Sequence, residues 1–65
     1  MTNLAEALPA EQQRVRELLD VYNTIPTGAF AAAMLRDALE RAERAAAAGD
    51  VVAMARSYAE LKECH

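Results

Sequence analysis

The chain has 65 residues and a formal net charge of −3, with 54% hydrophobic and 26% charged residues. This composition is typical of a folded protein and not of a disordered one, and the length predicts one small domain over residues 1–65. No apolar run approaches the roughly 20 residues that a membrane span needs, and no charged-then-apolar leader opens the chain. A single cysteine, Cys64, excludes an internal disulfide and a CxxC site.

The first helix is predicted over residues 9–23. Pro9 suits a first helical turn, because its missing N–H has no partner within the helix there. Pro26 biases Ile25 away from the helical conformation, which ends the helix before it. The apolar residues recur every three or four positions and form one stripe, which consists of Val15, Leu18, Leu19, Tyr22 and Ile25.

The segment over residues 1–8 is expected to fray or to form a short turn. Asn3 and Glu6 have the spacing of a weak capping box. Glu11 places negative charge near the positive end of the helix dipole. Because it also lies in line with Val15, Glu11 either compensates the dipole or is a buried acid.

A second, longer helix is predicted over residues 28–48, opened by Thr27 or Gly28. One broad face is apolar and the opposite face is charged. Acid-first pairs at i,i+4 spacing give the charged face a few tenths of a kcal/mol each and predict that water covers it. The apolar face consists of Met34, Leu35, Ala38, Leu39, Ala42, Ala45 and Ala46.

Gly49 and Asp50 predict a tight hinge between the second helix and a third helix over residues 51–63. Glycine favours the left-handed position that ends a helix, and aspartate is a strong N-cap for the next one. So short a connection makes the flanking helices antiparallel neighbours. The predicted inward seam of the third helix is Val51, Met54, Tyr58 and Leu61, with Ala55 beside it. The predicted fold is therefore all-α, a helix followed by a tight antiparallel αα-hairpin.

The core of such a fold is small. Sixteen of the hydrophobic residues are alanine, and Tyr22, Phe30 and Tyr58 are the only aromatic residues. In a domain of this size the free energy gained by burying apolar surface nearly equals the entropic cost of ordering the chain, and no disulfide adds stability. We therefore expect a homodimer.

The chain carries no catalytic or nucleotide-binding motif: GxGxxG, GxxxxGK[ST], GxSxG and HExxH are all missing from the sequence. We therefore expect no enzyme and no cofactor. Binding to phosphates requires a basic surface, whereas Arg36, Arg41 and Arg44 alternate with acidic residues in an acidic chain. Nucleic-acid binding is not expected either.

Cys64 and His65 are the remaining candidates for chemistry. Neighbours on a helix point about 100° apart and the last residues of a chain fray, which disfavours a catalytic pair. A metal site built from them with Glu60 or Glu63 requires a partner chain to complete it. The expected state is a frayed end with one exposed thiol, and no metal site.

The candidate partner-binding residues are Phe30, Met34, Ala38, Ala42 and Val52. Phe30 either plugs the end of the core or supplies an aromatic anchor to a partner. Met34 either fills a gap in the core or lines a binding groove. Ala38 and Ala42 form a smooth strip on which a second copy can pack by two-fold symmetry, and Val52 falls outside the predicted seam of its helix.

Residues 22–30, 33–34, 49–54 and 58–64 resemble short helical proteins encoded by bacteriophages and prophages, and the similarity covers most of residues 11–64. The resemblance implies an accessory factor in the cytoplasm of the bacterial host. Such a factor binds and inhibits or redirects a host protein, such as a transcription regulator, a motor ATPase or a defence component. The alternative is a structural or assembly subunit whose partner is itself or a virion component.

Overall fold

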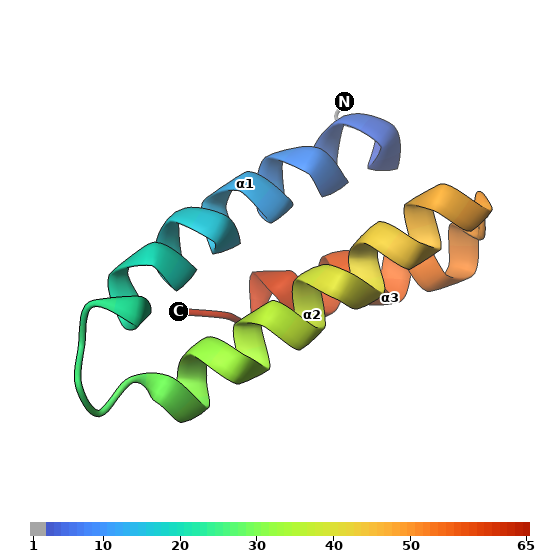
Figure 1. The fold of residues 1–65 in the computed structure, drawn as a ribbon. Helices are drawn as coiled ribbons and strands as arrows, with labels where there is room; N and C mark the ends of the chain where they lie inside the picture. Colours follow the sequence, from blue (N-terminus) through green and yellow to red (C-terminus); the bar gives the residue numbers. More distant parts are fainter. Residues whose placement is uncertain (1–2) are drawn as a thin grey trace.

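Three helices make up the protein in a computed structural model that describes residues 3–65. They are α1 (Leu4–Asn23), α2 (Ala29–Ala48) and α3 (Val51–Lys62), and each packs against the other two. The described residues contain no strand. The all-α prediction is therefore confirmed, with α2 and α3 lying side by side as an antiparallel hairpin and α1 packed along them (Figure 1).

Helix α1 begins at Leu4, and the expectation of a frayed segment before residue 9 is wrong for the residues that the structure describes. Asn3 is the N-cap, and its Oδ1 accepts a hydrogen bond from the Glu6 N–H at 3.0 Å. Pro9 therefore lies inside the helix, where a proline costs about 3 kcal/mol. Burial of Leu8, which is 1% exposed, contributes about 1.5–3 kcal/mol in return. Residues 1 and 2 of the predicted frayed segment lie outside the described residues.

The turn between α1 and α2 spans residues 24–28 and follows the prediction from Pro26. The Thr24 hydroxyl donates to the Val21 carbonyl at 2.7 Å, which closes the end of α1. Gly28 is the N-cap of α2, and a Cβ added there would lie 2.5 Å from the carbonyl oxygen of Tyr22. The turn therefore packs so tightly against the end of α1 that it requires glycine at this position.

The hinge between α2 and α3 has the predicted geometry. Gly49 is left-handed with φ of 65°, and the N–H groups of Gly49 and Asp50 donate to the carbonyls of Ala46 and Ala45, as in a Schellman motif. Asp50 Oδ1 accepts a hydrogen bond from the Ala53 N–H at 3.1 Å and caps α3. Two residues thus provide hydrogen-bond partners for backbone groups at the end of α2 and at the start of α3.

The inward seam of α3 differs from the prediction. Val51 is 66% exposed, whereas Ser57 is buried and Cys64 is half-buried against the core. The prediction placed the bulkier apolar side chains of α3 inward. The row of residues that packs against α1 and α2 is rotated slightly around the helix from that position. The observed seam is Met54, Ser57, Leu61 and Cys64, and Tyr58 packs beside it.

Few large side chains fill the core. Nine apolar residues are buried within residues 3–65, and four of them are alanine. The fully buried large side chains are Leu8, Val15 and Leu61. The radius of gyration is 11.9 Å, against about 10.7 Å expected for a compact chain of this length. The molecule is thus more extended than a domain with a complete core.

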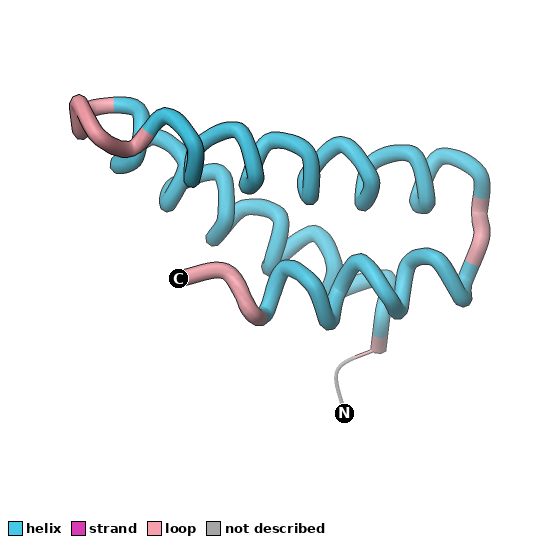
Figure 2. The backbone as a smooth tube through the Cα atoms, turned by 90° about the horizontal axis from the view of Figure 1, so that it is seen from below, coloured by secondary structure: helices cyan, strands magenta, loops and turns pink. Residues whose placement is uncertain are grey.

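Helix α3 is the short member of the bundle. Its 12 residues span about 18 Å, whereas the 20 residues of α1 and of α2 span about 30 Å each. Because α3 starts at the hinge end, it stops before it reaches the α1–α2 turn (Figure 2). The last turns of α1 and the first turns of α2 therefore have no helix across them on this side.

Candidate functional site

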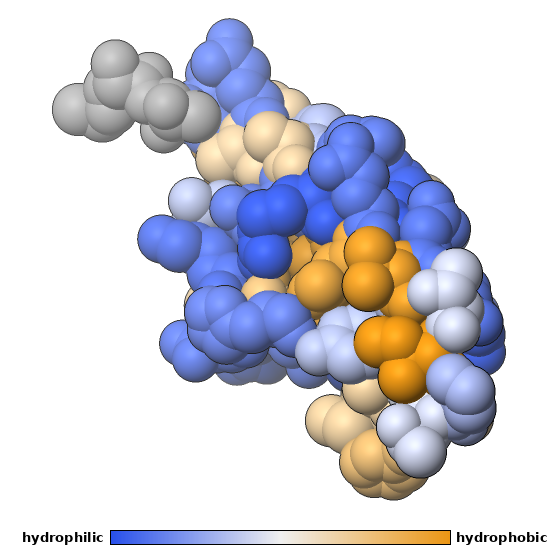
Figure 3. Space-filling model, turned by 90° about the vertical axis from the view of Figure 1, so that its left-hand side faces the viewer, coloured by the Kyte–Doolittle hydropathy of each residue, from blue (hydrophilic) through white to orange (hydrophobic). Residues whose placement is uncertain are grey.

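Exposed apolar side chains concentrate around the α1–α2 turn, where α3 does not reach. Among the described residues six large hydrophobic side chains are exposed, and four of these lie between positions 21 and 34. We call these four the turn surface: Val21 (55% exposed), Ile25 (41%), Phe30 (79%) and Met34 (57%). Figure 3 looks onto this end of the molecule and shows hydrophobic surface interrupting the polar exterior.

A groove of about 320 Å³ adjoins the turn surface. It lies between the first half of α2 and the end of α3, and Met34 belongs both to its lining and to the turn surface. Tyr22 of α1 lines it, and the chain end after α3 borders it. The uncharged residues that line it are Tyr22, Ala31, Met34, Leu35, Ala38, Cys64 and His65, and the charged ones are Arg41, Glu60 and Glu63.

The structure separates the five predicted partner-binding residues into two groups. Phe30, Met34 and Val52 are exposed, whereas Ala38 is 3% and Ala42 is 0% exposed. Ala42 is therefore not available to a second copy, because α1 and α3 already cover it, whereas Ala38, although almost as buried, lines the groove. Phe30 does not plug the core either, because it is 79% exposed. Val52 lies in the first turn of α3, at the hinge end and away from the turn surface.

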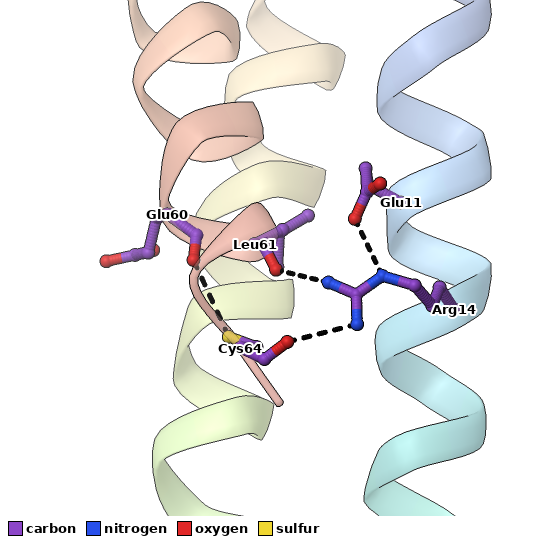
Figure 4. A network of polar contacts seen from close by, with 5 residues as sticks. All are labelled: Glu11, Arg14, Glu60, Leu61 and Cys64. Carbon is purple, nitrogen blue, oxygen red and sulfur yellow. Dashed lines mark hydrogen bonds and ion pairs between the residues drawn. The ribbon is translucent and has the colours of Figure 1, made fainter.

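Arg14 closes the seam between α1 and the end of α3, a role that the sequence pattern did not indicate. Its Nη2 donates to the Leu61 carbonyl at 2.7 Å and its Nη1 to the Cys64 carbonyl at 3.0 Å (Figure 4). Its Nε is held by Glu11 Oε2 at 2.9 Å. The Leu61 carbonyl also accepts the Cys64 N–H at 3.1 Å, so Arg14 adds a second donor to it. The guanidinium also opposes the negative end of the helix dipole.

The chain end is consequently held in place, and the expectation of a frayed terminus is wrong. Besides the two contacts of Arg14, the Tyr22 hydroxyl donates to the His65 carbonyl at 2.7 Å. Glu11, the candidate buried acid of the sequence, is the ion-pair partner that orients Arg14. We name the contacts of Arg14 with Glu11, Leu61 and Cys64 the Arg14 clamp.

Cys64 is half-buried rather than an exposed thiol. Its Sγ donates to the Glu60 carbonyl, with 3.6 Å between sulfur and oxygen. Burial raises the pKa of the Cys64 thiol, and this effect outweighs the opposite pull of the nearby Arg14 charge. The thiol therefore stays protonated near neutral pH, the form that is a poor nucleophile.

A second hollow, of about 400 Å³, lies between α2 and α3 near the hinge and has a charged lining. Arg44 and Arg56 line it, but so do Asp50 and Glu60, and Glu60 is bound to Arg41 at 3.0 Å. Arg41 also lines the hollow, so three arginines face two acids and the lining carries an excess of one positive formal charge. Within residues 3–65 no group of three His, Cys, Asp or Glu side chains is placed to hold a metal ion.

No helix in the described part of the chain combines the length and the apolar character that crossing a membrane requires. Comparison with protein-family models, with curated proteins and with solved structures finds no match for this chain. The turn surface, defined by exposure and chain geometry alone, is the candidate functional site.

Proposed function

We propose that this protein is a non-enzymatic interaction module that binds another protein chain through the turn surface. The observation that carries the proposal is the distribution of large apolar side chains. Five of them are buried in the described residues and six are exposed. Isolated exposed apolar residues are ordinary, whereas a group of them beside an apolar groove is typical of an interaction site.

Phe30 is the expected anchor of the contact. Among the large hydrophobic side chains of residues 3–65 it is the most exposed, at 79%, and its aromatic ring offers the largest apolar area of the turn surface. Aromatic side chains that enter a pocket of a partner dominate the binding energy of many interfaces. Phe30 lies in the first turn of α2, so that the helix holds its backbone rigidly.

The partner class follows from the resemblance to bacteriophage and prophage proteins. On that basis the protein acts in the cytoplasm of a bacterial host and inhibits or redirects a host protein, such as a transcription regulator, a motor ATPase or a defence component. The second candidate is a structural or assembly subunit whose partner is itself or a virion component. It is favoured by the position of an exposed aromatic ring next to a groove on the same molecule.

Site-specific crosslinking in cells tests the proposal. A photoreactive phenylalanine analogue replaces Phe30 in one variant and Ala47 in a control, because Ala47 is exposed on the same helix but away from the turn surface. We expect a crosslinked product at position 30 and none at position 47, and mass spectrometry then identifies the second chain. Equal crosslinking at both positions, or none at either, contradicts the proposed function.

A further inference from the structure

We propose that the chain bound at the turn surface is a second copy of this protein, in a two-fold contact in which each Phe30 enters the groove of the other copy. This inference rests on the proposed function and names its partner. A two-fold contact uses the same patch on both copies, so the patch must carry both a protruding group and a recess that accepts it.

Phe30 and the groove meet that requirement. Phe30 precedes Met34 by four residues, which places the two side chains one above the other on the same face of α2. Met34 lines the groove, whereas Phe30 is 79% exposed and contributes nothing to the lining. The ring therefore stands beside its own groove without filling it. When the α2 helices of two copies run antiparallel, Phe30 of each copy lies opposite Met34 of the other.

The available area matches a small, stable interface. Weighted by their exposed fractions, the four side chains of the turn surface present roughly 300–400 Å² of apolar surface per copy. An interface core is about 60% apolar, so the contact would bury roughly 1,000–1,300 Å² over both copies. That area reaches the range of about 1,000 Å² and above expected of biological interfaces.

The charges near the groove are compatible with two-fold pairing. The charged residues that line the groove are Arg41, Glu60 and Glu63. Arg41 and Glu60 form an ion pair at 3.0 Å, and Glu63 is exposed after the end of α3. Water and salt therefore screen Glu63 from the charges of the second copy, and the uncharged Phe30 ring adds no like charge to the groove.

Sedimentation equilibrium on the full chain, from about 1 µM to about 1 mM, measures the mass and the dimer Kd directly. The test variant is Phe30→Asp and the matched control is Val52→Asp. Phe30 and Val52 are both the second residue of a helix, both exposed, and both at a position where a carboxylate suits the helix dipole. Far-UV circular dichroism verifies that each variant keeps its helices.

We expect the wild type and Val52→Asp to sediment as two copies, and Phe30→Asp to raise the dimer Kd by roughly 30-fold or more. Met34→Asp supplies a second variant on the same surface and should weaken the dimer as well. A wild type that stays a single copy at 1 mM, or a Phe30→Asp variant that dimerises like the wild type, overturns the inference.

The crosslinking experiment separates this inference from the proposed function. A single-copy protein that crosslinks through position 30 to a different protein overturns the second copy as partner but supports the interaction module. A single-copy protein without any crosslink at position 30 contradicts both. A crosslink from position 30 to residues of the groove of another copy supports both.

Discussion

The Arg14 clamp and the turn surface lie on the same side of α1, about two turns apart. The residues of the clamp contact other residues of the same chain, whereas the apolar side chains of the turn surface are exposed to solvent. At the clamp, α3 runs beside α1, and one guanidinium binds two carbonyls and a carboxylate of the same chain. Beyond the end of α3, Val21 and Ile25 meet solvent. The difference shows that the length of α3 sets the border between core and exposed apolar surface.

Leu61→Ala, a substitution beside the Arg14 clamp, should lower the free energy of unfolding more than any other change considered. Leu61 is 0% exposed and its carbonyl is a clamp acceptor, so the substitution opens a cavity beside the contact. We expect a loss of about 2–5 kcal/mol in the free energy of unfolding, enough to unfold so small a domain. Thermal unfolding followed by circular dichroism measures it, and a melting temperature within a degree of the wild type would contradict a core built around Leu61.

Gly28→Ala should disturb the geometry of the turn surface from within. The added methyl group would lie 2.5 Å from the Tyr22 carbonyl oxygen and 3.2 Å from that of Ile25, so the turn must shift. A destabilisation of about 1–3 kcal/mol is expected, as for an overpacked position. Urea titration gives the value. Ala33→Gly, in the exposed part of α2, serves as a comparison that costs only about 1 kcal/mol through helix propensity.

Arg14→Ala tests the clamp separately from the core. Removing the guanidinium leaves the Cys64 carbonyl to water and the Leu61 carbonyl with only the Cys64 N–H as donor, and should cost about 1–2 kcal/mol. Arg16→Ala is the matched control, because Arg16 forms only an exposed ion pair with Glu43 at 3.5 Å and should cost less than about 0.5 kcal/mol. Equal losses in urea titrations of the two variants would show that the clamp contributes no more than a surface pair.

Phe30→Ala tests whether the main aromatic side chain of the turn surface stabilises its own chain. Because Phe30 contributes little to the core of its own chain, the substitution should change the unfolding free energy of the single copy by less than about 0.5 kcal/mol. The measurement is a urea titration at a protein concentration below the dimer Kd. A loss above about 2 kcal/mol there would place Phe30 in the core and remove it from the turn surface.

Ionisation of the Cys64 thiol at alkaline pH should produce the smallest change in stability. Because the pKa of Cys64 is raised in the folded chain above its ordinary value of 9.0, the unfolded thiol ionises first. Stability should therefore be constant below pH 9 and fall as the pH rises through the folded value. Melting temperatures of the wild type and Cys64→Ala between pH 7 and pH 10.5 give the difference. An equally steep decline in Cys64→Ala would assign the loss to other groups.

Local signals in the sequence predicted most of the fold. Pro26, Gly49 and Asp50 act on backbone dihedral angles and caps within a few residues, so they place the end of α1 and both ends of the hinge from the sequence alone. Asn3 carries an equally local signal and caps α1, whereas the prediction placed the helix start at Pro9. In the structure Pro9 lies inside α1, beside the buried Leu8.

The candidate site was predicted only in part. Phe30, Met34 and Val52 are predicted contact residues and are exposed, whereas Ala38 and Ala42, predicted as a strip for a second copy on the apolar face of their helix, are buried in the core of the same chain. A helical wheel places all of these residues relative to the axis of one helix. It does not say how far along that axis a neighbouring helix extends, and this extent determines which part of an apolar face stays open.

The amino-acid sequence by itself determined three amphipathic helices, their turns and the antiparallel hairpin, because helix propensity, caps and backbone restrictions act over short distances. Only the tertiary structure decided that Arg14 holds the end of α3, that Ser57 rather than Val51 faces inward, and that Phe30 stands beside an empty groove. These features depend on contacts between residues up to 50 positions apart, whose register comes from packing all three helices together.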